Sequence, residues 1–488
     1  MTSKKESDNL NKKALVSGSA FVATQMLVRS ITFLLTPIFT RLVSTEQYGI
    51  IHVYESTLLL TVPIFSLCLY RSVERAKFDF KDKFDEFVSS ALTLSLISIF
   101  VAFLVITLFF KDVFMQIAGL DTLMYIYMIL YTVFYTSYQF YIRKEKQLLR
   151  YKQATAVTII ATGPATVLSV ILVYFGNRAG KLDALVDLRT IGFYTPMIIG
   201  GIAAAYFIYK TANFKVSTKY WKYGLAYSLP LIPEMISITI MNQSDKLMVK
   251  NMVGAAESGI FSLATTVSAI IWILEDSVWN AWLPWLYEKI NRDEKKDAAE
   301  MWQKIVILFS FISWMLVLLG PEIILVLGGK KYAASVYLIA PMVTGTLFRF
   351  SSFMHTAVQN YYKKTKTVAI GTVLAMIINV ILNYVCILKY GYQAAAYTTA
   401  VSYLLLVIIQ CYLEKRVTGS NLFPPKRILL ILISVFAINT ATMLLFGVAR
   451  PVRYLIAVLA MAIMFYVCRP YLSKMLEVFK FKKTSERG

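Results

Sequence analysis

Residues 220–267 read YWKYGLAYSLPLIPEMISITIMNQSDKLMVKNMVGAAESGIFSLATTV, and this stretch decides the fold. Its first apolar run is interrupted by Pro230 and Pro233, and a second apolar run begins after a short polar turn. An α-helix rises about 1.5 Å per residue, so about 20 apolar residues cross a bilayer. Because the runs are of that length, the stretch predicts two membrane-spanning helices, the first of them broken.

A similar pattern occurs near the N-terminus. Residues 41–57 (RLVSTEQYGIIHVYEST) align without a gap with residues 251–267 (NMVGAAESGIFSLATTV), so that a Gly-Ile pair coincides. The same offset of 210 residues places residues 169–174 (SVILVY) over residues 379–384 (NVILNY). We interpret the chain as two homologous halves joined near residues 213–219, with the opening stretch beginning the second half.

The composition is that of a membrane protein. Of 488 residues, 58% are hydrophobic and 16% are charged, and the mean hydropathy is +0.61. A net charge of +22 in a soluble chain would suggest nucleic acid as a partner, but here lysine and arginine lie in short clusters between apolar runs. This arrangement favours membrane orientation over nucleic-acid binding. The polar N-terminus lacks a cleavage site and is predicted to be a cytoplasmic tail.

Fourteen apolar segments have the length of a membrane-spanning helix, and the period-two alternation of barrel strands is absent. They lie at about 14–38, 49–72, 86–110, 119–142, 153–175, 188–210, 223–244, 256–284, 300–327, 334–359, 367–388, 392–413, 427–447 and 452–472.

The predicted fold class is therefore an all-α integral membrane protein with 14 transmembrane helices. The segments form two pseudo-symmetric six-helix bundles followed by two C-terminal helices. The predicted boundaries are a cytoplasmic tail at 1–13, an N-terminal bundle at 14–213, a C-terminal bundle at 219–413, an extra helix pair at 427–472 and a cytoplasmic tail at 473–488.

The distribution of positive charge predicts the orientation. With the N-terminus in the cytoplasm, 36 of the 50 lysines and arginines fall in inner segments and 12 in outer loops, and Arg29 and Arg349 lie within helices. This threefold bias is typical of loops that face the cytoplasm. Both termini are predicted to be cytoplasmic. Trp279, Trp282 and Trp285 lie at the inner end of the eighth helix, as an interfacial aromatic belt would.

Catalytic machinery is not apparent in the sequence. It contains no Gly-rich phosphate loop, no H-E-x-x-H and no nucleophile elbow. The four cysteines and two histidines are not spaced as a metal site. We therefore predict that the chain is not an enzyme, with no catalytic residue, metal or cofactor.

Charges at membrane depth are the informative residues, because a charge in lipid costs several kcal/mol. Arg29 in the first helix and Glu55 in the second are predicted at similar depth. One interpretation is a structural Arg29–Glu55 ion pair. The other is that Arg29 meets an anionic substrate in a water-filled cavity, with Glu55 taking part in ion coupling.

Two later helices carry the other candidates. Arg349 is the only charge in the tenth helix and has His355 near it, so both are predicted to line a substrate-binding cavity. Glu234 follows the proline break in the seventh helix, where freed carbonyls and a carboxylate suit a proton or cation site. The alternatives are snorkelling for Arg349 and helix packing for Glu234. Lys246 and its neighbour Asp245 are predicted to cap an outer helix end, and Glu275 is explained by solvation at the interface.

Several segments resemble the polysaccharide exporters, the Wzx-type flippases, of the multidrug/oligosaccharidyl-lipid/polysaccharide (MOP) superfamily. The resembling segments are TPIFTRLVSTEQYGI (36–50), SLPLIPEMI (228–236), QSDKLMVKNMVGAAESGIFSLATTV (243–267), GPEIILVLGGKKYAASVYLIAPMVTG (320–345) and NVILNYVCILKYGYQAAAYTTAVSY (379–403).

The resemblance implies two six-helix bundles around a central cavity, and transport of polyprenyl-pyrophosphate-linked oligosaccharide across the bacterial cytoplasmic membrane by alternating access. The product would be capsule, the O-antigen of lipopolysaccharide or another cell-wall polysaccharide. The implied partners are the lipid-linked oligosaccharide, membrane lipids, and the polymerase and glycosyltransferases of the same pathway. Coupling to a proton or sodium gradient, or to membrane potential, is left open.

Three alternatives remain. A lipid II flippase of the same superfamily is expected to carry arginines on the first, second and eighth helices, and this chain offers only Arg29 on the first. A drug/cation antiporter is expected to have twelve helices and a cavity dominated by carboxylates. A membrane polysaccharide polymerase or ligase would need a large extracytoplasmic loop, which the sequence lacks.

Overall fold

The computed structural model describes residues 30–31, 33–212, 214–448, 450–462, 464 and 466. All regular secondary structure in these residues is helical, and eleven of the helices are long and apolar enough to cross a membrane. The predicted all-α membrane fold is confirmed. The count of fourteen stays a prediction, because most of the first predicted helix lies outside the described residues. The chain divides into two compact units, Met1–Gly259 and Ile260–Gly488.

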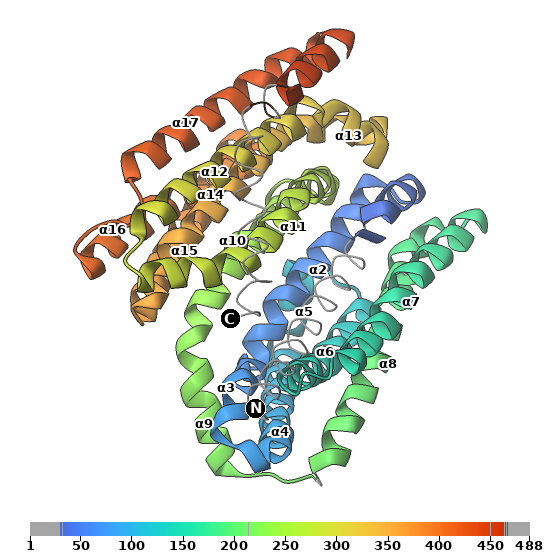
Figure 1. The fold of residues 1–488 in the computed structure, drawn as a ribbon. Helices are drawn as coiled ribbons and strands as arrows, with labels where there is room; N and C mark the ends of the chain where they lie inside the picture. The colour runs from blue at the N-terminus through green and yellow to red at the C-terminus, as the bar shows by residue number, and fades with distance from the viewer. Residues whose placement is uncertain are drawn as a thin grey trace. The chain divides into compact units, whose positions relative to one another are not determined.

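In its described residues, unit 1 contains the short helix Phe33–Leu42, the helices α2 to α10 and the first turn of α11. Figure 1 labels α2 to α11. α7 and α6 both pack along α8, and α10 packs along α2. The bounds are α2 Thr45–Phe65, α3 Val73–Asp79, α4 Phe84–Val105, α5 Lys111–Ala118, α6 Thr122–Gln147, α7 Tyr151–Arg178, α8 Leu185–Ala212, α9 Thr218–Ser228, α10 Ile232–Met252 and α11 Ala255–Asn291.

The predicted break in the seventh span is present. α9 ends at Ser228, the 3₁₀ turn Leu229–Leu231 follows, and α10 begins at Ile232. Pro230 and Pro233 lie at the starts of the 3₁₀ turn and of α10, where a missing N–H removes no helical hydrogen bond.

The second predicted half begins inside unit 1. α9 packs on α4, and α10 packs on α2, so residues 218–252 belong by their contacts to the N-terminal unit. The division by contacts at Gly259 lies later along the chain than the predicted join of the two homologous halves at 213–219, and the predicted boundaries stay a prediction. An apolar pattern predicts that a segment is a helix, but it does not predict which other helices pack against that segment.

Unit 2 is built around α14, the most enclosed of the apolar helices. It packs against α12, α16 and α17. The helices of this unit after α11 are α12 Lys295–Leu318, α13 Gly320–Leu327, α14 Val336–Tyr361, α15 Thr365–Tyr390, α16 Gln393–Thr418 and α17 Pro425–Thr442, and residues 450–462 are also helical.

One of the tryptophans predicted for the interfacial belt belongs to this core. Trp282 is 2% exposed and its ring lies 5.1 Å from that of Trp302, which is fully buried. The indole face is thus used for packing inside unit 2. The cluster of tryptophans in sequence reflects a buried aromatic contact as much as an interface.

Polar contacts fix the last helices to unit 2. Asn439 on α17 donates to the hydroxyls of Ser313 and Thr344, each at 2.8 Å. Farther along, the guanidinium of Arg453 is 3% exposed and forms an ion pair at 2.5 Å with Glu322. Buried polar groups of this kind are costly unless paired, so they define where the extra helix pair docks.

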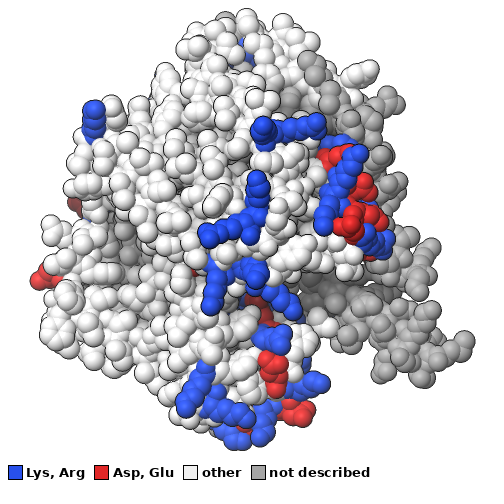
Figure 2. Space-filling model, turned by 90° about the vertical axis from the view of Figure 1, so that its left-hand side faces the viewer, with Lys and Arg blue, Asp and Glu red and all other residues white. Residues whose placement is uncertain are grey.

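The surface confirms a multi-pass membrane protein. Large apolar side chains are exposed along the long helices, among them Phe100 (65%), Ile199 (61%) and Leu430 (68%). Figure 2 shows that on the face drawn there the charged side chains gather in one region, while much of the remaining surface carries none. Such a surface suits contact with lipid rather than with water.

Candidate functional site

A charged cluster joins α2 and α8 in the interior of unit 1. The Glu55 carboxylate accepts a hydrogen bond from Nη2 of Arg189 at 3.0 Å, and its other oxygen lies 3.0 Å from Nδ1 of His52. The exposed fractions of these side chains are 28%, 10% and 20% for Glu55, Arg189 and His52. All three therefore keep contact with the solvent-accessible space while lying on membrane-spanning helices.

A third helix, α10, completes the cluster. The Ser56 hydroxyl, one residue after Glu55, donates to Oε1 of Gln243 at 3.0 Å, and Nζ of Lys246 lies 3.4 Å from the same oxygen. Lys246 also interacts electrostatically with Glu55 and with its neighbour Asp245. We call His52, Glu55, Arg189, Gln243 and Lys246 the charged cluster.

Local structure holds these side chains in place. α2 begins with a complete capping box, in which Ser44 and Gln47 satisfy each other's backbone N–H groups. The guanidinium of Arg189 lies over the ring of Phe193 at 4.1 Å, one turn along α8. Arg189 is thus held between the Glu55 carboxylate and an aromatic face, a setting that suits arginine better than lysine.

The chemistry available to this cluster has two parts. The lysine and arginine can hold an anion such as a phosphate, because both donate charge-assisted hydrogen bonds. The imidazole of His52 and the carboxylate of Glu55 lie 3.0 Å apart, close enough to share a proton between them. Anion binding and protonation would influence each other, because Glu55 touches Arg189 and His52 directly.

Arg349 lies at a different kind of site, in the core of unit 2. Its Nη2 atom is 2.9 Å from Oε2 of Glu275, and the two side chains are 8% and 0% exposed. The guanidinium also lies over the rings of Trp272 at 4.0 Å and Phe353 at 4.9 Å. Glu275 is therefore not solvated at an interface, as the sequence analysis expected, but is the buried counter-charge of Arg349.

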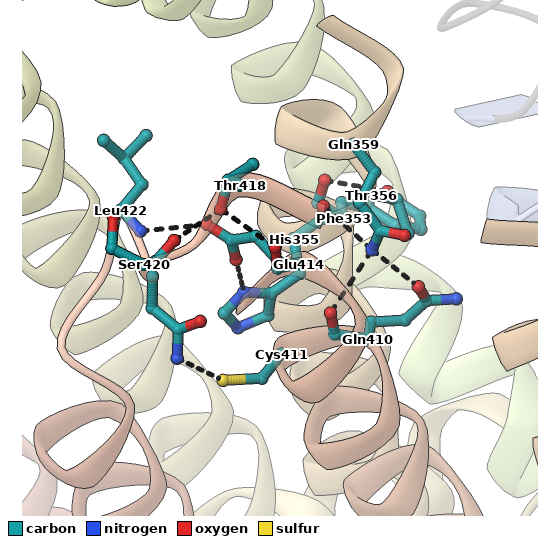
Figure 3. Close-up of polar contacts among 11 residues, drawn as sticks. Phe353, His355, Thr356, Gln359, Gln410, Cys411, Glu414, Thr418, Ser420 and Leu422 are labelled. Atoms are coloured by element: carbon teal, nitrogen blue, oxygen red, sulfur yellow. Dashed lines mark hydrogen bonds and ion pairs between the residues drawn. The ribbon is translucent and has the colours of Figure 1, made fainter. Parts of the chain in front are cut away.

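His355 is likewise paired inside unit 2. Figure 3 shows its ring, on α14, facing the carboxylate of Glu414 on α16, and Nδ1 contacts Oε2. The other carboxylate oxygen accepts from the backbone N–H of Leu422 at 2.9 Å. With exposed fractions of 1% and 0%, this pair joins α14 to the segment that leads into α17. A cavity role for Arg349 and His355 stays a prediction.

The structure separates the predicted site residues. Glu55 belongs to the charged cluster, whereas Glu234 is half-buried in the first turn of α10 and interacts electrostatically with Arg71. Arg29 lies outside the described residues, so the predicted Arg29–Glu55 pair is not tested. Within the described chain, the ion-pair partners of Glu55 are Arg189 and His52.

Sequence reasoning missed Arg189 and Lys246. Arg189 lies at the start of the apolar segment predicted at 188–210, so it was interpreted as part of the preceding loop. Lys246 was assigned to a helix end, but α10 continues to Met252 and places it well inside. The available signal was the run LMVKNM, residues 247–252, which continues the helix past the polar turn.

Comparison with protein-family models gives two matches. The model described as "Polysaccharide biosynthesis protein" matches residues 15–290, which is more than half of the chain. The MatE model matches residues 230–385.

Two curated proteins are similar in sequence. "Capsular polysaccharide biosynthesis protein CapF" of Staphylococcus aureus is 25% identical over 404 residues, which cover 79% of this chain and 95% of that protein. "Lsg locus putative protein 1" of Haemophilus influenzae is 26% identical over 191 residues, covering 36% and 46%.

Solved structures share the fold. The lipid II flippase MurJ in an inward closed conformation superimposes with a TM-score of 0.67 at 17% identity, covering 93% of this chain and 99% of that one. An inward-facing multidrug resistance MATE family transporter of the MOP superfamily gives 0.63 at 13% identity, covering 83% and 98%. The chain is a multi-pass membrane protein of the polysaccharide biosynthesis protein family.

Proposed function

We propose that the protein is a flippase that moves polyprenyl-pyrophosphate-linked oligosaccharide across the bacterial cytoplasmic membrane. The product would serve the synthesis of capsule, O-antigen or another surface polysaccharide. The family match supports polysaccharide export as the pathway. The observation that carries the substrate class is the charged cluster, because it offers two cations on membrane-spanning helices where an unused charge would be costly.

In this proposal the pyrophosphate is held chiefly by Lys246. Arg189 is already engaged by Glu55, whereas the nearest hydrogen-bond partner of the Lys246 ammonium is the neutral amide of Gln243. An ammonium that keeps free donors can bind phosphate oxygens without first breaking a strong ion pair. Arg189 would then stabilise the second phosphate or orient Glu55.

Transport would proceed by alternating access, driven by an ion gradient. We assign ion coupling to Glu55, because its carboxylate lies between Arg189 and His52 beside the proposed phosphate site. Glu234 beside Arg71 is the second candidate for an ion-coupling role. No resident cofactor enters this scheme.

Lys246→Gln should reduce export by roughly ten- to a hundredfold, because a hydrogen bond to a charged group contributes about 1.5–3 kcal/mol. The measurement is surface polysaccharide in cells that lack the native gene and express the variant, normalised to the amount of protein in the membrane. Lys246→Arg keeps the charge and should retain part of the activity.

Lys222→Gln is the matched control, since Lys222 is an exposed lysine on the preceding helix, α9. It should export at the wild-type rate. Normal membrane abundance of Lys246→Gln together with wild-type export would contradict the proposed phosphate site. The same assay on Glu55→Gln and Glu234→Gln, with and without a proton uncoupler, compares the two carboxylates.

The proposed orientation has its own test. In a variant whose native cysteines are replaced, single cysteines at Lys83 and Lys296 should react with a thiol reagent only after the cells are opened. A cysteine at Gly180 should react in intact cells: no atom lies within 4 Å of an added Cβ, although a side chain at φ +72° strains this turn. If the residues at 180 and 296 react alike, the predicted number of crossings between them is wrong.

A further inference from the structure

Helix α6 combines the length of a membrane-spanning helix with an unusual polarity. It has 26 residues, about 39 Å at the usual helical rise, and six of them are tyrosines. It is not among the eleven helices that are apolar enough to cross a membrane by composition. A helix of this kind needs a polar or aromatic environment along one face, because lipid offers its hydroxyl groups no partner.

That face can be traced residue by residue. From residue 127 to residue 143, every fourth side chain of α6 is half-buried, and the residue directly after each of these is buried. The half-buried side chains are Tyr127, Tyr131, Tyr135, Gln139 and Arg143. Residues four apart are neighbours on a helix surface, so these side chains form a row, which winds around α6 by about 40° at each step. We call them the tyrosine row.

The rings of the row are held in a fixed arrangement. Tyr131 and Tyr135 are stacked, with centroids 4.8 Å apart and planes at 13°. Tyr131 also meets the ring of Tyr194 edge-on at 4.9 Å, and the Tyr135 phenol hydrogen-bonds Gln139. The stacked tyrosine side chains are already fixed, so little of their conformational entropy is lost when a ligand binds to them.

Charged groups lie beside Tyr131, the second member of the row, and at its last member, Arg143. Tyr194, beside Tyr131, interacts electrostatically with Glu55 and Arg189 of the charged cluster. Arg143 forms an ion pair with Glu74. Tyr131 and Arg143 are twelve residues apart, about 18 Å along the helix. The row therefore extends from the proposed phosphate site along most of the remaining length of α6.

We propose that the tyrosine row binds the oligosaccharide of the lipid-linked substrate while the charged cluster holds its pyrophosphate. A sugar ring presents both C–H groups and hydroxyls, and tyrosine matches both with an aromatic ring and a phenol that donates and accepts hydrogen bonds. Gln139 adds an amide of the same capacity. The inference rests on the proposed function, because it assigns a part of that substrate to a second surface.

The test compares two probes. One is undecaprenyl pyrophosphate, which carries no sugar, and the other is the lipid-linked oligosaccharide extracted from cells that lack the protein. Their affinities are measured for the purified full-length chain in detergent. Tyr131→Leu/Tyr135→Leu should bind the glycosylated probe about tenfold more weakly, since two aromatic contacts are lost, and the sugar-free probe as wild type does.

Two further variants separate the possible causes. Tyr131→Phe/Tyr135→Phe keeps the stacked rings and should lose less affinity for the glycosylated probe than the leucine variant. Tyr206→Leu removes a tyrosine that is 58% exposed on α8, outside the row, and should leave both affinities unchanged. Unchanged binding of the sugar-free probe also reports that the leucine variant is folded.

The outcomes distinguish this inference from the proposed function. If wild type binds both probes and the leucine variant prefers the glycosylated probe as strongly as wild type does, the tyrosine row is not the sugar site. Equal weakening of both probes also overturns the assignment, because the rings would then support the fold or the phosphate site. If cells lacking the protein accumulate no lipid-linked oligosaccharide, the proposed function fails first and this inference with it.

Discussion

Glu275→Ala should destabilise the protein by about 3–5 kcal/mol, because it leaves the guanidinium of Arg349 buried without a counter-charge. The carboxylate is fully enclosed, and Arg349 is only 8% exposed, so water cannot replace the lost partner. The measurement is the thermal unfolding midpoint in detergent. Glu300→Ala, which removes an exposed carboxylate from α12, should leave the midpoint unchanged.

A double variant separates structure from transport at this pair. Glu275→Leu/Arg349→Met removes both charges and fills similar space, and buried ion pairs replaced in this way often keep or gain stability. The double variant should therefore unfold near the wild-type temperature. If it is stable and exports polysaccharide normally, Arg349 is structural. If it is stable and export is lost, Arg349 contributes to the substrate path.

Gly259→Ala should prevent close packing of α11 on α2 and reduce stability by about 3 kcal/mol or more. A Cβ atom added at Gly259 would lie 2.0 Å from the backbone oxygen of Thr45, and one added at Gly49 would lie 1.9 Å from that of Ala255. Neither obstacle is a flexible side chain, so the helices themselves would have to move apart. The amount of folded protein in detergent, measured by size-exclusion chromatography, reports the effect.

Gly163→Ala should not reduce the stability of the protein, in contrast to Gly259→Ala. No atom lies within 4 Å of a Cβ built at Gly163, which is in the interior of α7. Alanine is the better helix former by about 1 kcal/mol, so this variant should be as stable as wild type or more stable. If Gly163→Ala lost as much folded protein as Gly259→Ala, the close backbone contact at Gly259 would not be the cause of the loss.

The 210-residue offset in the sequence predicted that Gly49 and Gly259 are equivalent positions, but it did not predict that they lie in contact. Gly49 and Gly259 are equivalent positions in the two aligned segments. A Cβ atom added at either glycine would collide with the backbone of the segment that carries the other. The alignment shows that the two glycines are equivalent, whereas their close approach depends on how the two segments pack in the folded chain.

Helix positions were predictable because apolar runs and prolines act locally. The break at Pro230 and Pro233 is an example, since a missing N–H limits the backbone whatever the helix packs against. The π-helical segment Ile106–Phe110 at the end of α4 was not predicted, because its sequence, ITLFF, is as apolar as the rest of that span.

Charge pairing was not predictable, because it depends on contacts between distant residues. Arg349 was recognised as a costly charge, but its partner Glu275 lies 74 residues earlier and was assigned to an interface for its tryptophan neighbours. Glu55 and Arg189 are 134 residues apart, with no spacing rule to connect them. The residue types and depths indicated that partners must exist, and only the fold identified them.

The polarity of α6 has a consequence for how the chain is made. Each span leaves the insertion machinery for lipid largely according to its own side chains, and six tyrosines give α6 little tendency to do so alone. α8, on which α6 packs, is synthesised later. A nascent chain that stops before residue 185 would hold α6 without that cover, so α6 is covered only when α8, the second helix after it, has emerged.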